Sequence, residues 1–138
     1  AALYRAVKAA DELKAKYGME AEIINLHSLV PLNYEKIIAS VKKTGRVVLV
    51  SDACQRGSFL NDIAANITEL CFDDLDAPCV VVGARNWITP PFEFDEYFFP
   101  QPSWMIDAIH TRIGPIPGYV AEHSPSDVEL ERRSKAGV

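Results

Sequence analysis

Two short runs of almost purely apolar, largely β-branched residues constrain the fold of this chain more than any other feature. The runs cover residues 46–50 and 79–82. A strand that is apolar along its whole length is typically buried on both faces, as in a parallel sheet covered by helices. Right-handed crossover connections place those helices over the faces of the sheet. The sequence therefore predicts an α/β fold around a mostly parallel sheet.

Amphipathic patterns separate and flank these runs. Apolar residues at three- and four-residue steps predict four helices, over residues 2–17, 34–43, 58–72 and 103–113. Gly18 and Gly45 supply left-handed stops, and Asn33 and Ser58 are the predicted N-caps of the second and third helices. A further short strand is predicted over residues 21–26.

Residues 84–102 break this alternation, because they are rich in proline and aromatic residues. We expect a packed loop, and aromatic side chains of this kind suit a subunit interface. Beyond Gly118 the composition becomes polar. The sequence thus predicts one folded domain over residues 1–118 and a polar C-terminal tail over residues 119–138, mobile unless a partner orders it.

The chain of 138 residues is long enough to bury a core without disulfides or metals. Its three cysteines form no Cys-x-x-Cys pair, which favours a reducing compartment and argues against zinc. No apolar run reaches membrane length, and the net charge of −5 argues against nucleic acid. Because the chain begins without Met and inside a helical pattern, we expect a domain of a longer polypeptide.

The charges are unevenly distributed. Residues 60–100 carry one basic and eight acidic side chains, a net charge of −7. If these side chains share one surface, they form a docking face for a basic partner, since complementary fields steer encounter. The alternative is a solvated face that keeps the protein soluble.

Residues 51–59, between a strand and a helix, are the strongest local candidate for chemistry. A helix start presents free N–H groups and a positive dipole, which suits an anion or a partner's carboxylate with Arg56 assisting. The alternative is a plain turn in which Gly57 gives backbone freedom and Asp52 pairs with Arg56. Cys54 has no base nearby in sequence to activate it. The chain has no phosphate loop or nucleophile elbow, so no catalytic or metal-binding residue is predicted.

Several segments together carry a family resemblance. They cover residues 21–33, 41–48, 56–65 and 72–78. In this order and spacing the chain resembles, over residues 1–114, the C-terminal domain of the beta subunit of thiamine-diphosphate-dependent 2-oxo acid dehydrogenases, the decarboxylase components of the pyruvate and branched-chain complexes. The resemblance implies a transketolase C-terminal-type fold, with three α/β/α layers and a five-stranded mixed sheet whose first strand would precede residue 1.

The resemblance also implies a function for the complete enzyme. Such enzymes oxidatively decarboxylate a 2-oxo acid with thiamine diphosphate and Mg, and pass the acyl group to lipoamide. Other domains hold that cofactor, so this piece alone is expected to bind none and to be inactive. Cys71, Phe72 and Trp104 resemble the branched-chain (2-oxoisovalerate) type more than the pyruvate type. The expected location is the cytoplasm, or the mitochondrial matrix in a eukaryote.

The partners implied by the resemblance are an alpha subunit, a second beta subunit and the acyltransferase core. Asp76 occupies the position that helps to hold the small subunit-binding domain of the acyltransferase. The predicted partner-binding residues are Asp52, Arg56, Gly57, Phe59, Asp73 and Asp76. Two alternatives stay open: another thiamine enzyme that shares the domain, such as a transketolase, a deoxyxylulose-phosphate synthase or a 2-oxo acid–ferredoxin oxidoreductase, and a non-catalytic binding module of doubly wound fold.

Overall fold

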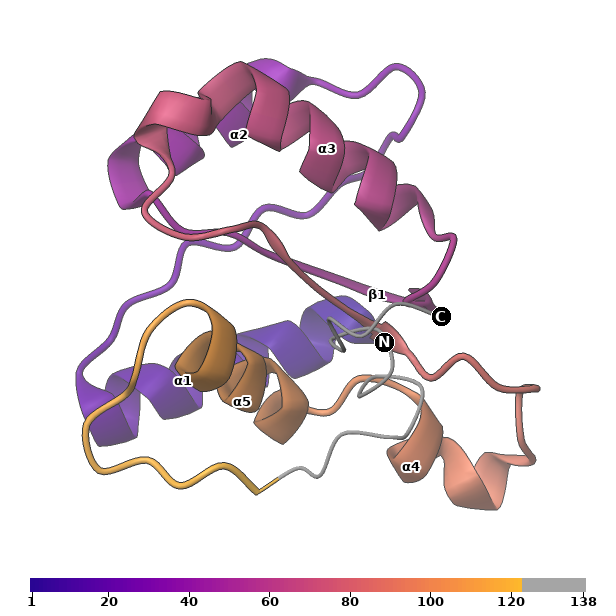
Figure 1. The fold of residues 1–138 in the computed structure, drawn as a ribbon. Coiled ribbons are helices and arrows are strands. Elements are labelled where there is room, and N and C mark those ends of the chain that lie inside the picture. The colour runs from indigo at the N-terminus through magenta and orange to yellow at the C-terminus, as the bar shows by residue number, and fades with distance from the viewer. Residues whose placement is uncertain (123–138) are drawn as a thin grey trace, which may run out of the picture.

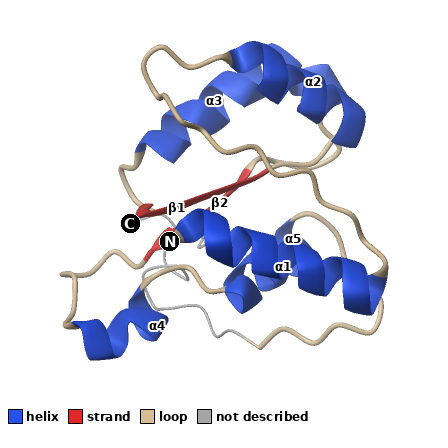
Figure 2. Ribbon diagram, turned by 180° about the vertical axis from the view of Figure 1, so that it is seen from behind, coloured by secondary structure: helices blue, strands red, loops and turns tan. Residues whose placement is uncertain are grey.

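The computed structural model describes residues 1–122, which fold around a small sheet of two parallel strands, β1 (Val48–Cys54) and β2 (Val80–Ala84). Two helices cover one face of the sheet: α1 (Ala2–Tyr17) and α5 (Pro102–Arg112). Two others cover the opposite face: α2 (Tyr34–Thr44) and α3 (Phe59–Cys71) (Figure 1, Figure 2). The predicted three-layer α/β/α arrangement is confirmed.

The strands are buried on both faces because successive side chains of a strand point to opposite sides. Val80 and Val82 lie in the apolar cluster with α1 and α5, whereas Val81 lies in the cluster with α2 and α3. None of the three is more than 7% exposed. Alternate residues of one apolar run therefore fill two separate cores.

The ends of the first two helices follow the prediction. Gly18 and Gly45 adopt left-handed conformations, with φ of 64° and 66°, and end α1 and α2. Asn33 caps α2, because its side-chain oxygen accepts a hydrogen bond from the Glu35 amide at 3.0 Å.

Strand β1 is longer and less regular than predicted. Val50 pairs with Val82, and the next pair is Cys54 with Ala84. The segment of β1 between these two pairs is therefore longer than the matching segment of β2. The extra residues cross close to Gly83, where an added Cβ would lie 2.7 Å from the Ala53 carbonyl oxygen. Only glycine leaves room for this bulge. The loop predicted to start at Ser51 is therefore still strand as far as Cys54.

The strand predicted over residues 21–26 is wrong. This segment has no assigned strand, and no backbone hydrogen bond joins it to another strand within the described residues. Ile23 and Ile24 are 40% and 37% exposed. A β-strand is stabilised by backbone hydrogen bonds to a neighbouring strand, and this segment has no such neighbour within the described residues. The described residues accordingly hold two strands of the five that the resemblance implies.

The proline- and aromatic-rich segment contains two short helical turns, η2 (Phe92–Phe94) and α4 (Asp95–Phe98). Phe98 is buried at its end, whereas several apolar side chains before it are exposed. The segment is thus packed at its base and open at its tip.

After α5 the chain returns along α1. Ile116 is buried in the α1–α5 core, and its amide donates a hydrogen bond to Nδ1 of His110 at 2.9 Å. The Tyr119 hydroxyl donates to Oδ1 of Asp107 at 2.6 Å. Tyr119 begins the predicted tail; residues 123–138, which make up most of that tail, lie outside the described residues.

Candidate functional site

The six residues predicted to bind partners fall into two groups at opposite ends of α3. One group surrounds the turn from β1 into α3: Asp52, Arg56, Gly57 and Phe59. The other lies in the turn from α3 into β2: Asp73 and Asp76. Helix α3 has 13 residues, and an α-helix of that length spans about 20 Å. The structure therefore does not bring the six residues into one site.

Asp52 binds the start of α1. Its Oδ1 accepts a hydrogen bond from Arg5 Nη1 at 3.2 Å, and its Oδ2 accepts one from the Ala2 amide at 3.0 Å. A carboxylate at a helix N-terminus pairs with free N–H groups and with the positive end of the dipole. The pair of Asp52 with Arg56, which belonged to the alternative of a plain turn, is not formed, because α1 lies over the end of β1 and its Arg5 and Ala2 amide bind this carboxylate.

Arg56 and Gly57 form the exposed part of the β1–α3 turn. The Arg56 amide donates to Oδ1 of Asn86 at 2.8 Å, while its guanidinium makes no ion pair within the described residues. Gly57 has φ of 70° and nothing within 4 Å of an added Cβ. Its left-handed backbone, rather than a close contact, favours glycine. The turn thus exposes the Arg56 side chain and, three residues further along the chain, part of the Phe59 ring.

Ser58 stands at the N-cap of α3 but forms no capping bond. Its backbone is extended, as an N-cap requires, yet its hydroxyl oxygen is buried without a hydrogen-bond partner among the described residues. The turn is instead held by Asn61, whose side chain donates to the Gln55 carbonyl oxygen at 2.8 Å. The predicted cap is right in position and wrong in its bond.

The second group lies in a turn that begins with η1 (Phe72–Asp74) and is fixed to the end of α2. The Asp76 amide donates to the Gly45 carbonyl oxygen at 2.8 Å. A Cβ at Gly45 would lie 2.5 Å from Oδ2 of Asp76, so this carboxylate sits directly against the helix end. Asp73 and Asp76 are exposed and make no ion pair within residues 1–122. Both carboxylates are therefore open to a cation on another molecule.

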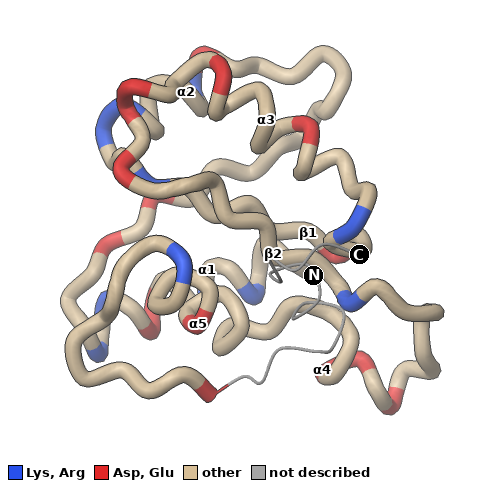
Figure 3. Tube along the Cα trace, viewed as in Figure 1, with Lys and Arg blue, Asp and Glu red and all other residues tan. Residues whose placement is uncertain are grey.

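The acidic stretch does not form one face. The acids of α3 and η1 lie on one side of the molecule, whereas Glu93, Asp95 and Glu96 lie on the separate α4 segment (Figure 3). Basic residues of α2, Lys42 and Lys43, lie in its last turn, next to the Asp76 turn. The condition set for a single acidic docking face, that these side chains share one surface, is therefore not met, and the acids form two separate regions.

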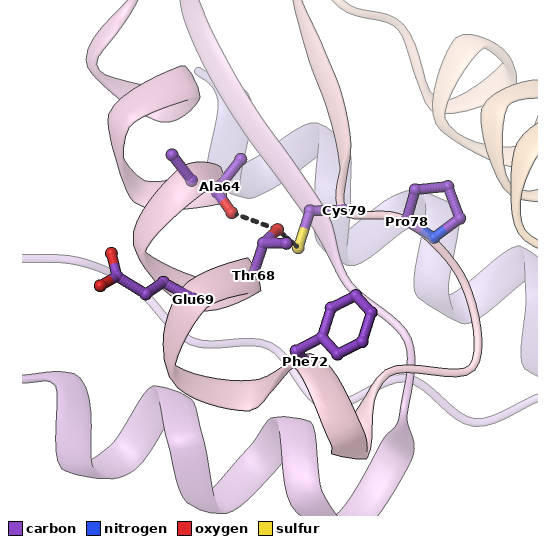
Figure 4. Close-up of a pocket in the computed structure, with 7 residues that line it drawn as sticks. Ala64, Thr68, Glu69, Phe72, Pro78 and Cys79 are labelled. Atoms are coloured by element: carbon purple, nitrogen blue, oxygen red, sulfur yellow. Dashed lines mark hydrogen bonds between the residues drawn. The ribbon is translucent and has the colours of Figure 1, made fainter.

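A shallow pocket of about 640 Å³ adjoins the Asp73–Asp76 turn. It lies between α3 and the start of β2, with an apolar floor and Glu69 at its edge (Figure 4). Thr68 Oγ1 donates to the Ala64 carbonyl oxygen at 2.7 Å and lies 3.8 Å from Cys79 Sγ. Burial raises the pKa of the Cys79 thiol, which keeps it protonated and unreactive near neutral pH. This site suits an apolar side chain.

This pocket was not predicted from the sequence. Its only signal is the small pair Ala64 and Ala65 on α3, both about two helical turns before the bulky Phe72. Whether small helix residues leave an open space depends on which element the fold packs beside them, and here that element is the start of β2.

The other candidate groups do not converge. His27 is exposed and lies 3.4 Å from Asn25, and the ring of His110 is used in the bond to the Ile116 amide. Within the described residues no group of His, Cys, Asp and Glu is placed to hold a metal ion. His123 lies outside those residues. Among residues 1–122 every helix is too short or too polar to cross a bilayer.

Comparison with known proteins identifies the family. The family described as transketolase, C-terminal domain, matches residues 1–104. This chain belongs to that family. It is 41% identical over 102 residues to the 2-oxoisovalerate dehydrogenase subunit beta of Pseudomonas aeruginosa, a match that covers 73% of this chain and 27% of the relative.

Two further relatives are named as pyruvate dehydrogenase subunits. The pyruvate dehydrogenase E1 component subunit beta of Bacillus subtilis is 34% identical over 101 residues, 73% of this chain and 31% of the relative. The mitochondrial pyruvate dehydrogenase E1 component subunit beta of Chaetomium thermophilum is 41% identical over 93 residues, 67% of this chain and 24% of the relative. The chain thus spans about a quarter to a third of these transketolase C-terminal domain relatives, and their names do not decide between the two substrates. The predicted resemblance is confirmed.

Proposed function

We propose that this transketolase C-terminal domain is the assembly and docking domain of the beta subunit of a 2-oxo acid dehydrogenase. The observation that carries the proposal is the match of residues 1–104 to the transketolase C-terminal domain family, together with the similarity to part of such beta subunits of both substrate types. The complete enzyme then decarboxylates a 2-oxo acid with thiamine diphosphate and Mg and passes the acyl group to lipoamide. Its location is the cytoplasm, or the mitochondrial matrix in a eukaryote.

The cofactor belongs, in this proposal, to other parts of the enzyme. Mg²⁺ prefers several oxygen ligands around one point, and the described residues of this domain do not fit that need. Asp52 is committed to Arg5 and to the start of α1, and no other group of acidic residues is placed to hold a metal ion there. The role of this domain is therefore contact with other chains.

Docking of the acyltransferase core is assigned to the Asp73–Asp76 turn. Both carboxylates are exposed, lack an ion pair within residues 1–122 and lie next to an apolar pocket. A basic subunit-binding domain can place a cation on these carboxylates and an apolar side chain in the pocket. The predicted partner residues of the β1–α3 turn, Arg56, Gly57 and Phe59, form a separate contact region, whereas Asp52 binds the start of α1.

Binding of the acyltransferase's subunit-binding domain to the full-length gene product tests this docking role. Asp76→Ala should weaken binding about tenfold at low salt and by less at moderate salt, because screening already reduces the wild-type attraction there. Asp11→Ala replaces an exposed acid on α1 that makes no ion pair within residues 1–122; it is the matched control and should bind as the wild type does. Equal affinity of Asp76→Ala and wild type at both salt concentrations contradicts the docking role.

The branched-chain substrate is favoured over pyruvate, on the strength of Cys71, Phe72 and Trp104. Co-expression of the full-length gene product with its alpha subunit allows kcat/KM to be compared for 2-oxoisovalerate and pyruvate. A higher value for 2-oxoisovalerate supports the assignment, and a higher value for pyruvate reverses it. Absence of thiamine-dependent turnover with either acid argues against the dehydrogenase itself.

A further inference from the structure

A cluster of apolar side chains projects from the fold without cover. We call residues 87–97 the aromatic lobe; it includes α4 and stands away from the sheet (Figure 1, Figure 2). Its large apolar side chains are between 53% and 94% exposed: Trp87, Ile88, Phe92, Phe94 and Tyr97. Soluble monomers seldom expose large contiguous apolar patches, and aromatic side chains are enriched at interfaces.

The lobe is held in a fixed shape, as a binding surface requires. The Arg85 side chain donates from Nε to the Tyr97 carbonyl oxygen at 2.9 Å, and its amide donates to the Phe98 carbonyl oxygen at 3.0 Å. Its guanidinium lies 5.3 Å from the ring centre of Trp87 and 4.6 Å from that of Trp104. These contacts tie both ends of the lobe to the body. A preordered surface loses less entropy on binding.

The charge of the lobe limits what can cover it. Residues 87–97 contain three acids and no Lys or Arg, and none of these acids forms an ion pair within the described residues. Arg85 is already engaged at the base of the lobe. The charged side chains of the lobe itself are therefore all acidic, and a partner gains by supplying cations around an apolar recess.

A second copy of this chain does not meet that requirement. A two-fold contact between lobes brings the acids of one lobe close to those of the other, since the lobe carries no Lys or Arg, and like charges across an interface are costly. The apolar pocket between α3 and the start of β2 does not offer the required recess either, because Glu69, rather than Lys or Arg, lies at its edge.

We infer that the aromatic lobe is the surface by which this domain joins a different polypeptide, one that offers an apolar recess edged by Lys or Arg. The inference rests on the proposed function, because it specifies where the subunit contact is made. The lobe lies away from the Asp73–Asp76 turn, which leaves that turn available to another partner at the same time (Figure 3).

The test measures binding of the alpha subunit to the full-length gene product. Ile88→Ser/Phe92→Ser removes the two most exposed apolar side chains of the lobe, at 94% and 84% exposure. It should raise Kd at least about tenfold, as loss of interface anchors does. Val30→Ser/Val120→Ser, at 84% and 80% exposure, is the matched control and should leave Kd unchanged. Equal thermal unfolding midpoints show that the variants fold.

A charge variant tests whether Lys or Arg residues edge the recess of the partner. Glu93→Gln/Glu96→Gln should slow association and flatten its dependence on salt, because rim charges act mainly on the association rate. Binding also buries Trp87, so its fluorescence should shift to shorter wavelength in the wild type and not in Trp87→Phe.

The outcomes separate the two proposals. If wild type binds no alpha subunit, the proposed function and the inference both fail. If Ile88→Ser/Phe92→Ser binds the alpha subunit like wild type, the inference fails and the proposed function stands. If that variant loses only self-association of the beta chain, the lobe serves a second copy and the inference is again overturned.

Discussion

Gly45 illustrates how a single residue can be required for two reasons. Its φ of 66° disfavours any side chain, and an added Cβ would also meet the Asp76 carboxylate. Gly18 has nearly the same φ of 64° with nothing within 4 Å. Gly18→Ala should therefore cost about 1–2 kcal/mol of unfolding free energy. Gly45→Ala should cost about 0.5–1.5 kcal/mol more, because Asp76 must leave its rotamer. Urea unfolding measures both.

A double-mutant cycle isolates the second reason. In an Asp76→Ala background, Gly45→Ala should cost no more than Gly18→Ala, since the blocking carboxylate is gone. An excess that persists without Asp76 would show that the contact is not its cause.

Tyr119 should make stability depend on alkaline pH. Burial, the hydrogen bond to Asp107 and the Asp107 charge raise the pKa of Tyr119 above its ordinary value of 10.0. A raised pKa stabilises the protonated folded form fully below pH 10, and this contribution is lost as pH rises through the folded pKa. Tyr119→Phe should lower the unfolding free energy at pH 7 by about 1–3 kcal/mol. Between pH 9 and 11 the gap between wild type and variant should shrink; a constant gap contradicts the assignment.

At the level of elements, replacing the two predicted N-cap residues with alanine should have different effects on stability. Asn33→Ala removes a bond of 3.0 Å to the Glu35 amide and should cost about 1 kcal/mol. Ser58→Ala removes a buried hydroxyl that has no partner within the described residues, so it should be neutral or slightly stabilising. Thermal unfolding of the two variants is the measurement, and equal losses would mean that Ser58 forms a bond in solution.

Local patterns predicted the elements whose stabilisation is local. The four long helices and the two buried strands follow from spacing, caps and apolar runs, each of which acts within a few residues. The strand at 21–26 failed because strand formation depends on a partner elsewhere in the chain. The alternative pairing of Asp52 with Arg56 and the predicted capping bond of Ser58 failed for the same reason. The partner of Asp52 and the hydrogen bonding of Ser58 both depend on which helix packs over the end of β1.

Arg85 should control the order of the aromatic lobe. Arg85→Ala removes the bond to the Tyr97 carbonyl and the contacts with Trp87 and Trp104, together worth about 1–3 kcal/mol. Arg85→Lys keeps the charge but not the planar group, so it should restore only part of the loss. Hydrogen exchange at residues 92–99 should quicken in both variants, whereas Arg56→Ala should leave it unchanged. Wild-type exchange in Arg85→Ala would show that other contacts hold the lobe.

For the whole molecule, the sequence predicted the layers and the family but not the distribution of the surfaces. The acids of residues 60–100 form one continuous stretch in sequence and two regions in space, because the stretch runs along α3, through the sheet and out into the lobe (Figure 3). Which charges share a face depends on chain reversals that span many residues. Patterns with a period of two or 3.6 residues carry no information about them.

The separation of these two regions predicts that two partners bind independently. The Asp76 turn and the aromatic lobe lie at opposite ends of the fold; within the described residues η1 packs on α3, whereas α4 packs on η2 (Figure 1). Changes at distant sites without shared partners add within about 0.3–0.5 kcal/mol. Combining Asp76→Ala with Ile88→Ser/Phe92→Ser should therefore weaken the subunit-binding domain only as much as Asp76→Ala does, and the alpha subunit only as much as the lobe variant does. Titration of each partner in the presence and absence of the other measures this, and a mutual effect above about fivefold, the lower bound typical of allosteric coupling, would show that the sheet between the two surfaces transmits binding.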